Sequence, residues 1–324
     1  MSRWRLKMAG ALVLGMGLLA AMVPAQARQA SAPSAAASRW VPMLWEVKGQ
    51  GEARVYLLGS THLLEPADYP LPADVEAAYA AADRLVFELA PAQMQSPALA
   101  MAMLRAGRRT DGRRLQDALP SAQWQALGQW AQRRSLPLQS LQGSKPWFVA
   151  LNISLTEMAA SGLKAELGLD RHLMARGAAD GKPMAGLEDG LAQIALFDTL
   201  DAAQQQAMLA EALDDAGNGA RMRGLLDAWR SGDVAVFWQQ SGAPLAERHP
   251  ALYQAINVAR NSDWLGQLPQ WLAADQGTTL MVVGALHLAG DDGLVTRLRA
   301  DGHTVTRVCT VPGCPPGERR RRRR

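Results

Sequence analysis

Two segments near opposite ends of the chain share one pattern, and this pattern restricts the folds that the chain can adopt. Residues 54–62 read RVYLLGSTH and residues 279–287 read TLMVVGALH. Each is an apolar run of strand length that ends in glycine, with a histidine three residues after that glycine. Such runs are typical of buried strands in a parallel sheet. The pattern therefore predicts two related strand–turn units that bring His62 and His287 together.

Each unit continues with a helix-prone segment and a further apolar run. The expected segments are strands at 40–47, 54–58 and 84–88 with a helix at 73–82, and strands at 279–283 and 303–308 with a helix at 292–301. The order of strand, helix and strand favours a right-handed parallel crossover. The two units are therefore expected to contribute strands to one sheet.

Most of the chain between the two units has the pattern of helices. Apolar residues recur at spacings of three and four, as at Trp124, Leu127 and Trp130, and glycine and proline interrupt the segments. We expect a helical insertion over about 92–275. The predicted fold class is α/β, with a mixed, largely parallel central sheet made of two related βαβ-like halves and this long helical insertion. One folded domain is expected over 40–311.

The N-terminus has the three parts of a secretory signal peptide. Positive residues precede the apolar run 9–23, and Ala25-Gln-Ala27 matches a cleavage site. We expect a signal peptide over 1–27, a flexible linker over 28–39 and a periplasmic or secreted mature protein; an uncleaved membrane anchor is the alternative. No later segment of the sequence is long and apolar enough to predict a membrane span.

The formal net charge of +4 does not describe the predicted domain. Arg3, Arg5 and Lys7 lie in the expected signal peptide, and 319–324 is a run of six arginines. Removing these nine positive charges from +4 leaves −5, so the remainder is mildly acidic and we expect no nucleic-acid partner. The tail 312–324 is predicted to be disordered, either as a solvated run or in contact with anionic lipid or polymer.

The two cysteines lie close together near the C-terminus. Cys309 and Cys314 are the only cysteines of the chain. In an exported protein an even pair at close spacing is typical of a disulfide bond. Two free thiols and metal binding are the alternatives, although a lone pair without the spacing of a zinc motif gives weak support for a metal site.

Three side chains with metal-binding chemistry follow or close the predicted parallel strands. His62 and His287 lie just past the ends of two strands, and Glu88 closes the strand after the first crossover. Ligands of open parallel sheets collect outside the carboxyl ends of the strands. Two imidazoles and a carboxylate suit a divalent metal with a position open to water, which would activate that water as a nucleophile. The alternative is that each histidine is structural or exposed.

A series of short motifs occurs in a defined order along the chain. These are Gly59-Ser-Thr-His62, Phe87-Glu88-Leu89, Gly168-Leu-Asp170, Gly186-Leu-Glu188 with Gln193, Ala228-Trp-Arg-Ser-Gly-Asp233, Arg260-Asn261 with Trp264, and Val283-Gly-Ala-Leu-His287. In order and spacing they resemble the TraB/GumN family over nearly all of the predicted mature chain. That family is related to the Tiki metalloproteases and, more distantly, to erythromycin esterases and the haem-binding ChaN proteins.

The resemblance implies a function and a set of site residues. In Tiki-like members the two Gly-x-x-His motifs and the glutamate are the metal-binding and catalytic residues, which correspond to His62, Glu88 and His287. The implied protein is an exported metal-dependent hydrolase, peptidase-like, that acts on a peptide or small-molecule substrate. The implied cofactor is a divalent ion such as zinc, manganese or cobalt.

Three further residues of the motifs are candidates for a supporting role. Glu188 could be a metal ligand or a general base, and Arg260 could stabilise an oxyanion or bind a substrate carboxylate. For both, a buried ion pair or a charge on a helix surface is the alternative. Asp170 is expected to be a helix cap or a residue that supports a ligand.

Two other functions are compatible with the sequence. One is a non-catalytic protein that holds haem or another ligand at the same sheet edge, with Tyr56 as the only nearby tyrosine. The other is a metal-free esterase in which His62 is the general base. Metal content and absorption of a haem group would distinguish these from the metal-dependent hydrolase.

Overall fold

The computed structural model describes residues 40–49, 51–216, 218–273 and 277–314. The predicted signal peptide (1–27) and linker (28–39) lie outside the described residues, as does the predicted tail from 315 onward. Among the described helices, none combines the length and the hydropathy needed to cross a bilayer.

The centre of the molecule is a six-stranded mixed sheet with the order β4-β3-β5-β2-β1-β6. Its strands are β1 (Leu44–Lys48), β2 (Arg54–Ser60), β3 (Arg84–Leu89), β4 (Met184–Glu188), β5 (Thr278–Gly284) and β6 (Val305–Arg307). The four strands β4, β3, β5 and β2 pair in parallel, and β1 pairs antiparallel with both β2 and β6. The α/β fold class with a largely parallel sheet is confirmed.

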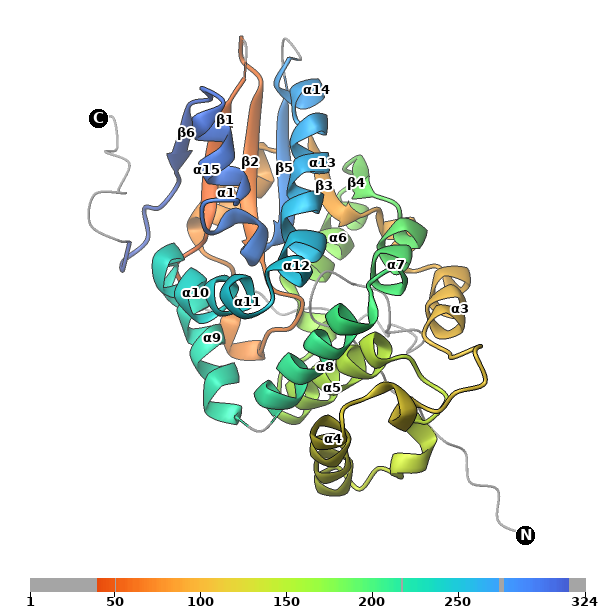
Figure 1. Ribbon diagram of the computed structural model, residues 1–324. Helices are drawn as coiled ribbons and strands as arrows, with labels where there is room; N and C mark the ends of the chain where they lie inside the picture. The colour runs from red at the N-terminus through yellow and green to blue at the C-terminus, as the bar shows by residue number, and fades with distance from the viewer. Residues whose placement is uncertain (1–39, 50, 217, 274–276, 315–324) are drawn as a thin grey trace.

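Helices account for most of the remaining described chain (Figure 1). The α-helices are α1 (Ala73–Ala81), α2 (Pro91–Met94), α3 (Pro97–Ala106), α4 (Ser121–Arg133), α5 (Pro146–Ala160), α6 (Leu169–Ala179), α7 (Gly190–Asp198), α8 (Ala202–Ala216), α9 (Gly219–Ser231), α10 (Val234–Gln240), α11 (Gly242–Arg248), α12 (Pro250–Tyr253), α13 (Ala259–Gln267), α14 (Pro269–Leu272) and α15 (Leu294–Ala300). A π-helix spans Gln254–Val258, and short 3₁₀ helices include Ala165–Leu167 and Ala285–Leu288. In Figure 1, α5 and α8–α11 lie beyond the carboxyl ends of β2 and β5.

The structure corrects the prediction that 92–275 is helical throughout. Residues Met184–Glu188 form the edge strand β4, which pairs in parallel with β3. This segment reads MAGLE and consists mainly of good helix formers, so its local preference does not indicate a strand. Pairing with a strand far away in sequence decides its conformation, and this pairing places Glu188 at the same sheet edge as Glu88.

The order of the strands also differs from a simple repeat of two units. The first unit, β2–α1–β3, has parallel strands as predicted, but β5 lies between β2 and β3 and pairs with both. The second unit, β5–α15–β6, has β2 and β1 between its two strands. The two Gly-x-x-His strands, β2 and β5, are therefore direct neighbours, which brings their histidines to adjacent positions along one edge.

The described residues form two large apolar cores, and members of both line a cavity between them. One core combines the sheet with the helices that cover it, and its members include Leu57, Phe87 and Met281. The other lies within the helical insertion and includes Trp147 and Leu209. The cavity lies where the carboxyl edge of the sheet meets the insertion, and members of both cores line it.

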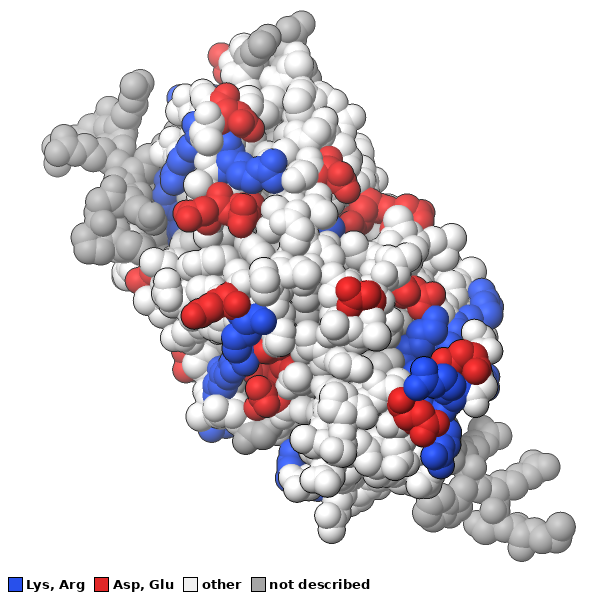
Figure 2. Space-filling view, in the orientation of Figure 1, with Lys and Arg blue, Asp and Glu red and all other residues white. Residues whose placement is uncertain are grey.

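The predicted disulfide bond between Cys309 and Cys314 is present. It closes the segment that follows β6, and the backbone N–H of Thr310 in that segment donates to a carboxylate oxygen of Asp74 on α1, at 2.7 Å. On the face of the molecule shown in Figure 2, acidic and basic side chains are interspersed over a largely uncharged surface.

Candidate functional site

The carboxyl ends of four parallel strands bring the predicted site residues together. Glu88 is the penultimate residue of β3, and Glu188 is the last residue of β4. His62 lies two residues past β2, and His287 lies in the 3₁₀ helix that follows β5. The fifth predicted residue, Arg260, reaches this edge from α13. All but Glu188 line one cavity, and Glu188 contacts this group through Arg260.

Arg260 is the centre of a buried network of hydrogen bonds. Its Nη2 donates to Glu88 Oε2 at 2.6 Å and also to Glu188 Oε1. Its Nε donates to Glu188 Oε2 at 3.2 Å, so the contact with Glu188 is bidentate. Its Nη1 lies 3.0 Å from Nε2 of His287. The guanidinium therefore contacts two carboxylates and one imidazole. Glu188 and Arg260 form a largely buried ion pair, which was the alternative interpretation of both residues from the sequence.

The charge of Glu88 is set by this network. Burial alone raises the pKa of a carboxyl group, but Arg260, His287, His62 and the N–H of Gly284 outweigh that effect and lower the pKa of Glu88 to about 2. The N–H of Gly284 donates to Glu88 Oε1 at 2.7 Å. Glu88 is thus a carboxylate at neutral pH, and both of its oxygens have a donor. The pKa of Glu188 is raised, with burial as the main cause.

The contacts of His287 fix its tautomer. A guanidinium has only donors, so Nε2 of His287 must accept from Arg260 and carries no proton. The proton is then on Nδ1, which lies 2.7 Å from Oδ1 of Asn261 and donates to it. Burial and the charge of Arg260 lower the pKa of His287 to about 3. The imidazole is therefore neutral, and its ring packs on Trp264 with 4.4 Å between ring centroids.

His62 has a carboxylate partner instead. Its Nδ1 lies 3.1 Å from Oδ2 of Asp170, so Nδ1–H donates to the carboxylate. Burial lowers the pKa of an imidazole, but Asp170 outweighs this and raises the pKa of His62 to about 9, with a smaller contribution from Glu88. His62 is therefore protonated at neutral pH in the protein alone. Because Asp170 engages Nδ1, Nε2 is the nitrogen left for a ligand.

Close packing at the start of α6 holds Asp170 against His62. A Cβ atom on Gly168 would lie 2.2 Å from the backbone oxygen of His62, so only glycine fits. The N–H of Leu169 donates to the oxygen of Thr61 at 3.0 Å. Gly168 is the residue that caps α6, and Asp170 is the second residue of the helix and does not cap it. Asp170 was predicted either to cap a helix or to support a ligand. Its contact with Nδ1 of His62 corresponds to the second of these roles.

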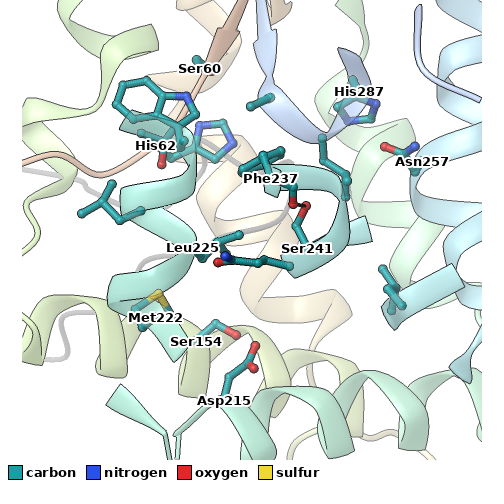
Figure 3. A pocket seen from close by; sticks show the side chains of 18 of the residues that line it. Ser60, His62, Ser154, Asp215, Met222, Leu225, Phe237, Ser241, Asn257 and His287 are labelled. Carbon is teal, nitrogen blue, oxygen red and sulfur yellow. Dashed lines mark hydrogen bonds between the residues drawn. The ribbon is translucent and has the colours of Figure 1, made fainter. Parts of the chain in front are cut away.

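The cavity has a volume of about 230 Å³ and is lined by both polar and apolar side chains (Figure 3). His62, Glu88, Arg260 and His287 form its charged end at the sheet edge. Apolar side chains make up much of the remaining lining: Met158, Met222, Leu225, Leu226, Trp229, Phe237, Leu245 and Ile256. Ser154 and Asp215, from α5 and α8, lie at the opposite end in Figure 3. Asp215 is paired there with Arg221, which also pairs with Glu211, and both of these residues line the cavity. A buried charged group at the end of an apolar cavity is the usual form of a small-molecule or catalytic site.

The two imidazoles and the carboxylate of His62, His287 and Glu88 are donor groups that suit a divalent metal. In this structure, however, Arg260 donates to Glu88 and His287, where an ion would bind. Both histidines have Nδ1 hydrogen-bonded to an oxygen, which is how metal-binding imidazoles are commonly oriented, with Nε2 as the ligand. In the part of the chain that the structure describes, no three His, Cys, Asp or Glu side chains are placed so that they could hold one ion. The predicted haem-related residue, Tyr56, does not line the cavity.

Sequence reasoning did not identify several residues of the site. Asn261 and Trp264 both contact His287. They follow Arg260 by one and four residues in the same sequence motif, and this proximity to Arg260 could have indicated that they belong to the site. Asn257 also lines the cavity. It precedes Arg260 by three residues, but nothing in the sequence distinguishes it from an ordinary helix residue.

Comparison with known proteins agrees with this architecture. A profile of the TraB/PrgY/GumN family matches residues 43–307. The chain is 26% identical over 258 residues to the uncharacterized protein YbaP of Escherichia coli K12. The aligned region covers 77% of this chain and 89% of YbaP. YbaP of Shigella flexneri has the same identity and coverage. No solved structure matches the chain at a significant level. The extent of the profile match, from β1 to β6, shows that the chain belongs to the TraB/PrgY/GumN family.

Proposed function

We propose that this chain is an exported, peptidase-like hydrolase whose reaction centre is the charged end of the cavity. In this proposal His62, His287 and Glu88 hold a divalent ion such as zinc, manganese or cobalt. When bound, such an ion would act as a Lewis acid on a substrate carbonyl group. The apolar lining of the cavity suits a substrate with apolar groups next to the reacting bond.

The observation that carries the proposal is the orientation of the two imidazoles. His62 and His287 come from neighbouring strands, and each has Nδ1 bound to an oxygen acceptor, Asp170 or Asn261. An oxygen acceptor on Nδ1 is the usual arrangement of a metal-binding imidazole, because it directs Nε2 toward the ion. Nε2 of His287 already carries no proton, whereas binding of an ion would have to displace the Nε2 proton of His62. Glu88, a carboxylate under the same conditions, supplies the oxygen ligand.

Arg260 has a defined part in this proposal. It now donates to Glu88 and His287, so an ion that binds these two residues requires Arg260 to give up those two contacts. Glu188 offers it a bidentate partner that does not depend on them. A guanidinium held in this way beside the reaction centre would bind a substrate carboxylate or stabilise negative charge on a carbonyl oxygen.

The alternative functions find less support in the same contacts. A protonated His62 cannot accept a proton, and the pKa of about 9 therefore disfavours a metal-free esterase with His62 as general base at neutral pH. A haem-binding role would call for an axial histidine or tyrosine beside an apolar cavity. Tyr56 is not among the lining residues, and of the two lining histidines, His287 has its Nε2 engaged by Arg260.

The test is hydrolysis by purified protein after treatment with a chelator and return of zinc, manganese or cobalt. Fluorescently labelled casein and p-nitrophenyl octanoate serve as the amide and ester probes. We expect hydrolysis that depends on the returned ion and is lost in His62→Ala and His287→Ala. His172→Ala is the matched control, because His172 packs on Tyr69 outside the cavity. Hydrolysis that persists without any ion, or that both variants retain, would contradict the proposal.

A further inference from the structure

A π-helix directs one polar side chain toward the cavity. The segment Gln254–Val258 joins α12 to α13 with the wider turn of a π-helix, a rare conformation that occurs frequently at functional sites. Asn257 lies in this turn and lines the cavity, and Arg260 follows it by three residues. Residues at this spacing lie side by side, with Cβ atoms about 5–6 Å apart. Asn257 is thus next to the charged end of the cavity.

The amide of Asn257 has one satisfied group and one unsatisfied group. The residue is 1% exposed. Its Nδ2 donates to the hydroxyl of Tyr253 at 3.2 Å. Its Oδ1 has no hydrogen-bond partner among the described residues, and Figure 3 shows the side chain directed into the cavity from the side of His287. A buried acceptor without a donor costs about 1–3 kcal/mol, so its retention indicates that a ligand supplies the donor.

A comparison with the other polar residues of the cavity supports this interpretation. The hydroxyl groups of Ser154 and Ser241 donate to backbone oxygens of their own helices. Ser60, which is 3% exposed and lies beside the two histidines, has a hydroxyl without a partner, as Asn257 has an unpaired oxygen. Glu211 and Asp215, which also line the cavity, each have one carboxylate oxygen without a hydrogen bond, but both carboxylates are ion-paired with arginines. Among the described lining residues, the buried neutral polar groups that lack a partner are therefore those of Ser60 and Asn257, whereas the hydroxyl groups of Ser154 and Ser241 need no ligand.

We propose that Oδ1 of Asn257 accepts a hydrogen bond from an N–H group of the substrate, so that the cavity selects amides, including peptides, over esters. An amide oxygen is an acceptor only, and it therefore discriminates a group that carries N–H from one that carries oxygen in the same place. A site built around such a hydrogen bond rejects an analogue that lacks the donor, because the buried acceptor is then left unpaired. The substrate class rests on the proposed hydrolase function, but recognition of N–H by Asn257 does not require turnover.

Binding of two matched probes tests the inference without hydrolysis. N-methyloctanamide and methyl octanoate differ only by N–H in place of oxygen, and both have an apolar chain for the lining of the cavity. Their dissociation constants would be measured by calorimetry with chelator-treated protein. The variants are Asn257→Leu, which keeps the size of the side chain, and Ser241→Ala, whose hydroxyl is satisfied within α10 and its end. Circular dichroism shows which variants are folded.

We expect the wild type and Ser241→Ala to bind the amide at least about tenfold more tightly than the ester, the usual worth of one such hydrogen bond. In Asn257→Leu the ratio should fall to about one. Equal affinities in the wild type, no binding of either probe, or an unchanged ratio in folded Asn257→Leu would overturn the inference. If Asn257→Leu does not fold, the ratio in Asn257→Ala decides. Amide selectivity without hydrolysis would instead contradict only the hydrolase proposal.

Discussion

The protonation states of the site residues depend on their neighbours, and the His62–Asp170 pair predicts how stability depends on pH. The folded protein binds the His62 proton more tightly than the unfolded chain does, because the pKa is raised from 6.5 to about 9. The stabilisation is complete below pH 6.5 and is lost as the pH rises through about 9. A difference of this size corresponds to something on the order of 3 kcal/mol.

Asp170→Asn should therefore lower the free energy of unfolding most near pH 6 and progressively less toward pH 9.5. Urea denaturation of chelator-treated protein across this range measures the difference. Asp189→Asn is the matched control, since Asp189 caps α7 by accepting from backbone N–H groups and has no histidine partner. Its effect should be constant over the same range. A constant effect of Asp170→Asn as well would be incompatible with a raised pKa of His62.

Arg260 makes a second prediction, because its removal leaves two buried carboxylates without their cation. The exposed fraction of the side chain is 7% for Arg260, 8% for Glu88 and 16% for Glu188. Arg260→Met should lower the free energy of unfolding by about 3–5 kcal/mol. Arg114→Met, which removes an exposed ion pair with Asp117, should have a much smaller effect, because solvent screens that pair. Similar costs of the two variants in urea denaturation would show that Arg260 does not neutralise the buried carboxylates.

Among the structural elements, α6 depends on close contact between its first turn and the segment after β2. The Cβ of an alanine at 168 would overlap the backbone oxygen of His62, so the helix start must move away from that segment. Gly168→Ala should therefore lower the free energy of unfolding by about 1–3 kcal/mol. It should also lower the pKa of His62, measured by NMR titration, because Asp170 moves with the helix.

Gly128→Ala is the control for this prediction. Gly128 lies within α4, and a Cβ there would contact only one methyl group of Leu138, at 3.5 Å. Alanine is favoured over glycine inside a helix by about 1 kcal/mol, so this variant should be as stable as the wild type or more stable. A Gly168→Ala protein that is equally stable, with an unchanged pKa of His62, would show that the contact is not required.

The sequence was most informative where local pattern and burial agree. The apolar runs of β2, β3 and β5 are buried central strands, so their composition alone indicates them. The edge strand β4 is short and lacks such a run, and only its pairing with β3 defines it. Likewise the order of the strands follows from pairing between distant segments, which no local pattern encodes.

The same division applies to the candidate site. His62, Glu88 and His287 could be grouped because each is tied to the carboxyl end of a predicted parallel strand. The contact of His62 with Asp170 joins residues 108 positions apart, and that of Arg260 with Glu88 joins residues 172 positions apart. These contacts set the protonation states, and they depend on how the helical insertion packs on the sheet. The residue types were therefore predictable, whereas the charges were not.

For the molecule as a whole, the C-terminal segment is held by the disulfide bond between Cys309 and Cys314. The bond closes a loop over a sequence separation of 5, and restriction of so short a loop in the unfolded chain stabilises by about 2 kcal/mol. A variant with both cysteines replaced by serine should lose about this much in urea denaturation. Reduction of the wild type should have a similar effect. An unchanged free energy of unfolding would mean that this segment does not contribute to the fold.

The central claim concerns the whole assembly of sheet edge, insertion and cavity, and metal stoichiometry tests it most directly. Mass spectrometry of the elements in protein purified without chelators should find about one zinc, manganese or cobalt ion per chain. The ion should be retained in His172→Ala and lost in His62→Ala and His287→Ala, with the circular dichroism of all three unchanged. A wild-type protein that holds none of these ions and takes up none on titration, or ions equally abundant in the two site variants, would contradict the claim.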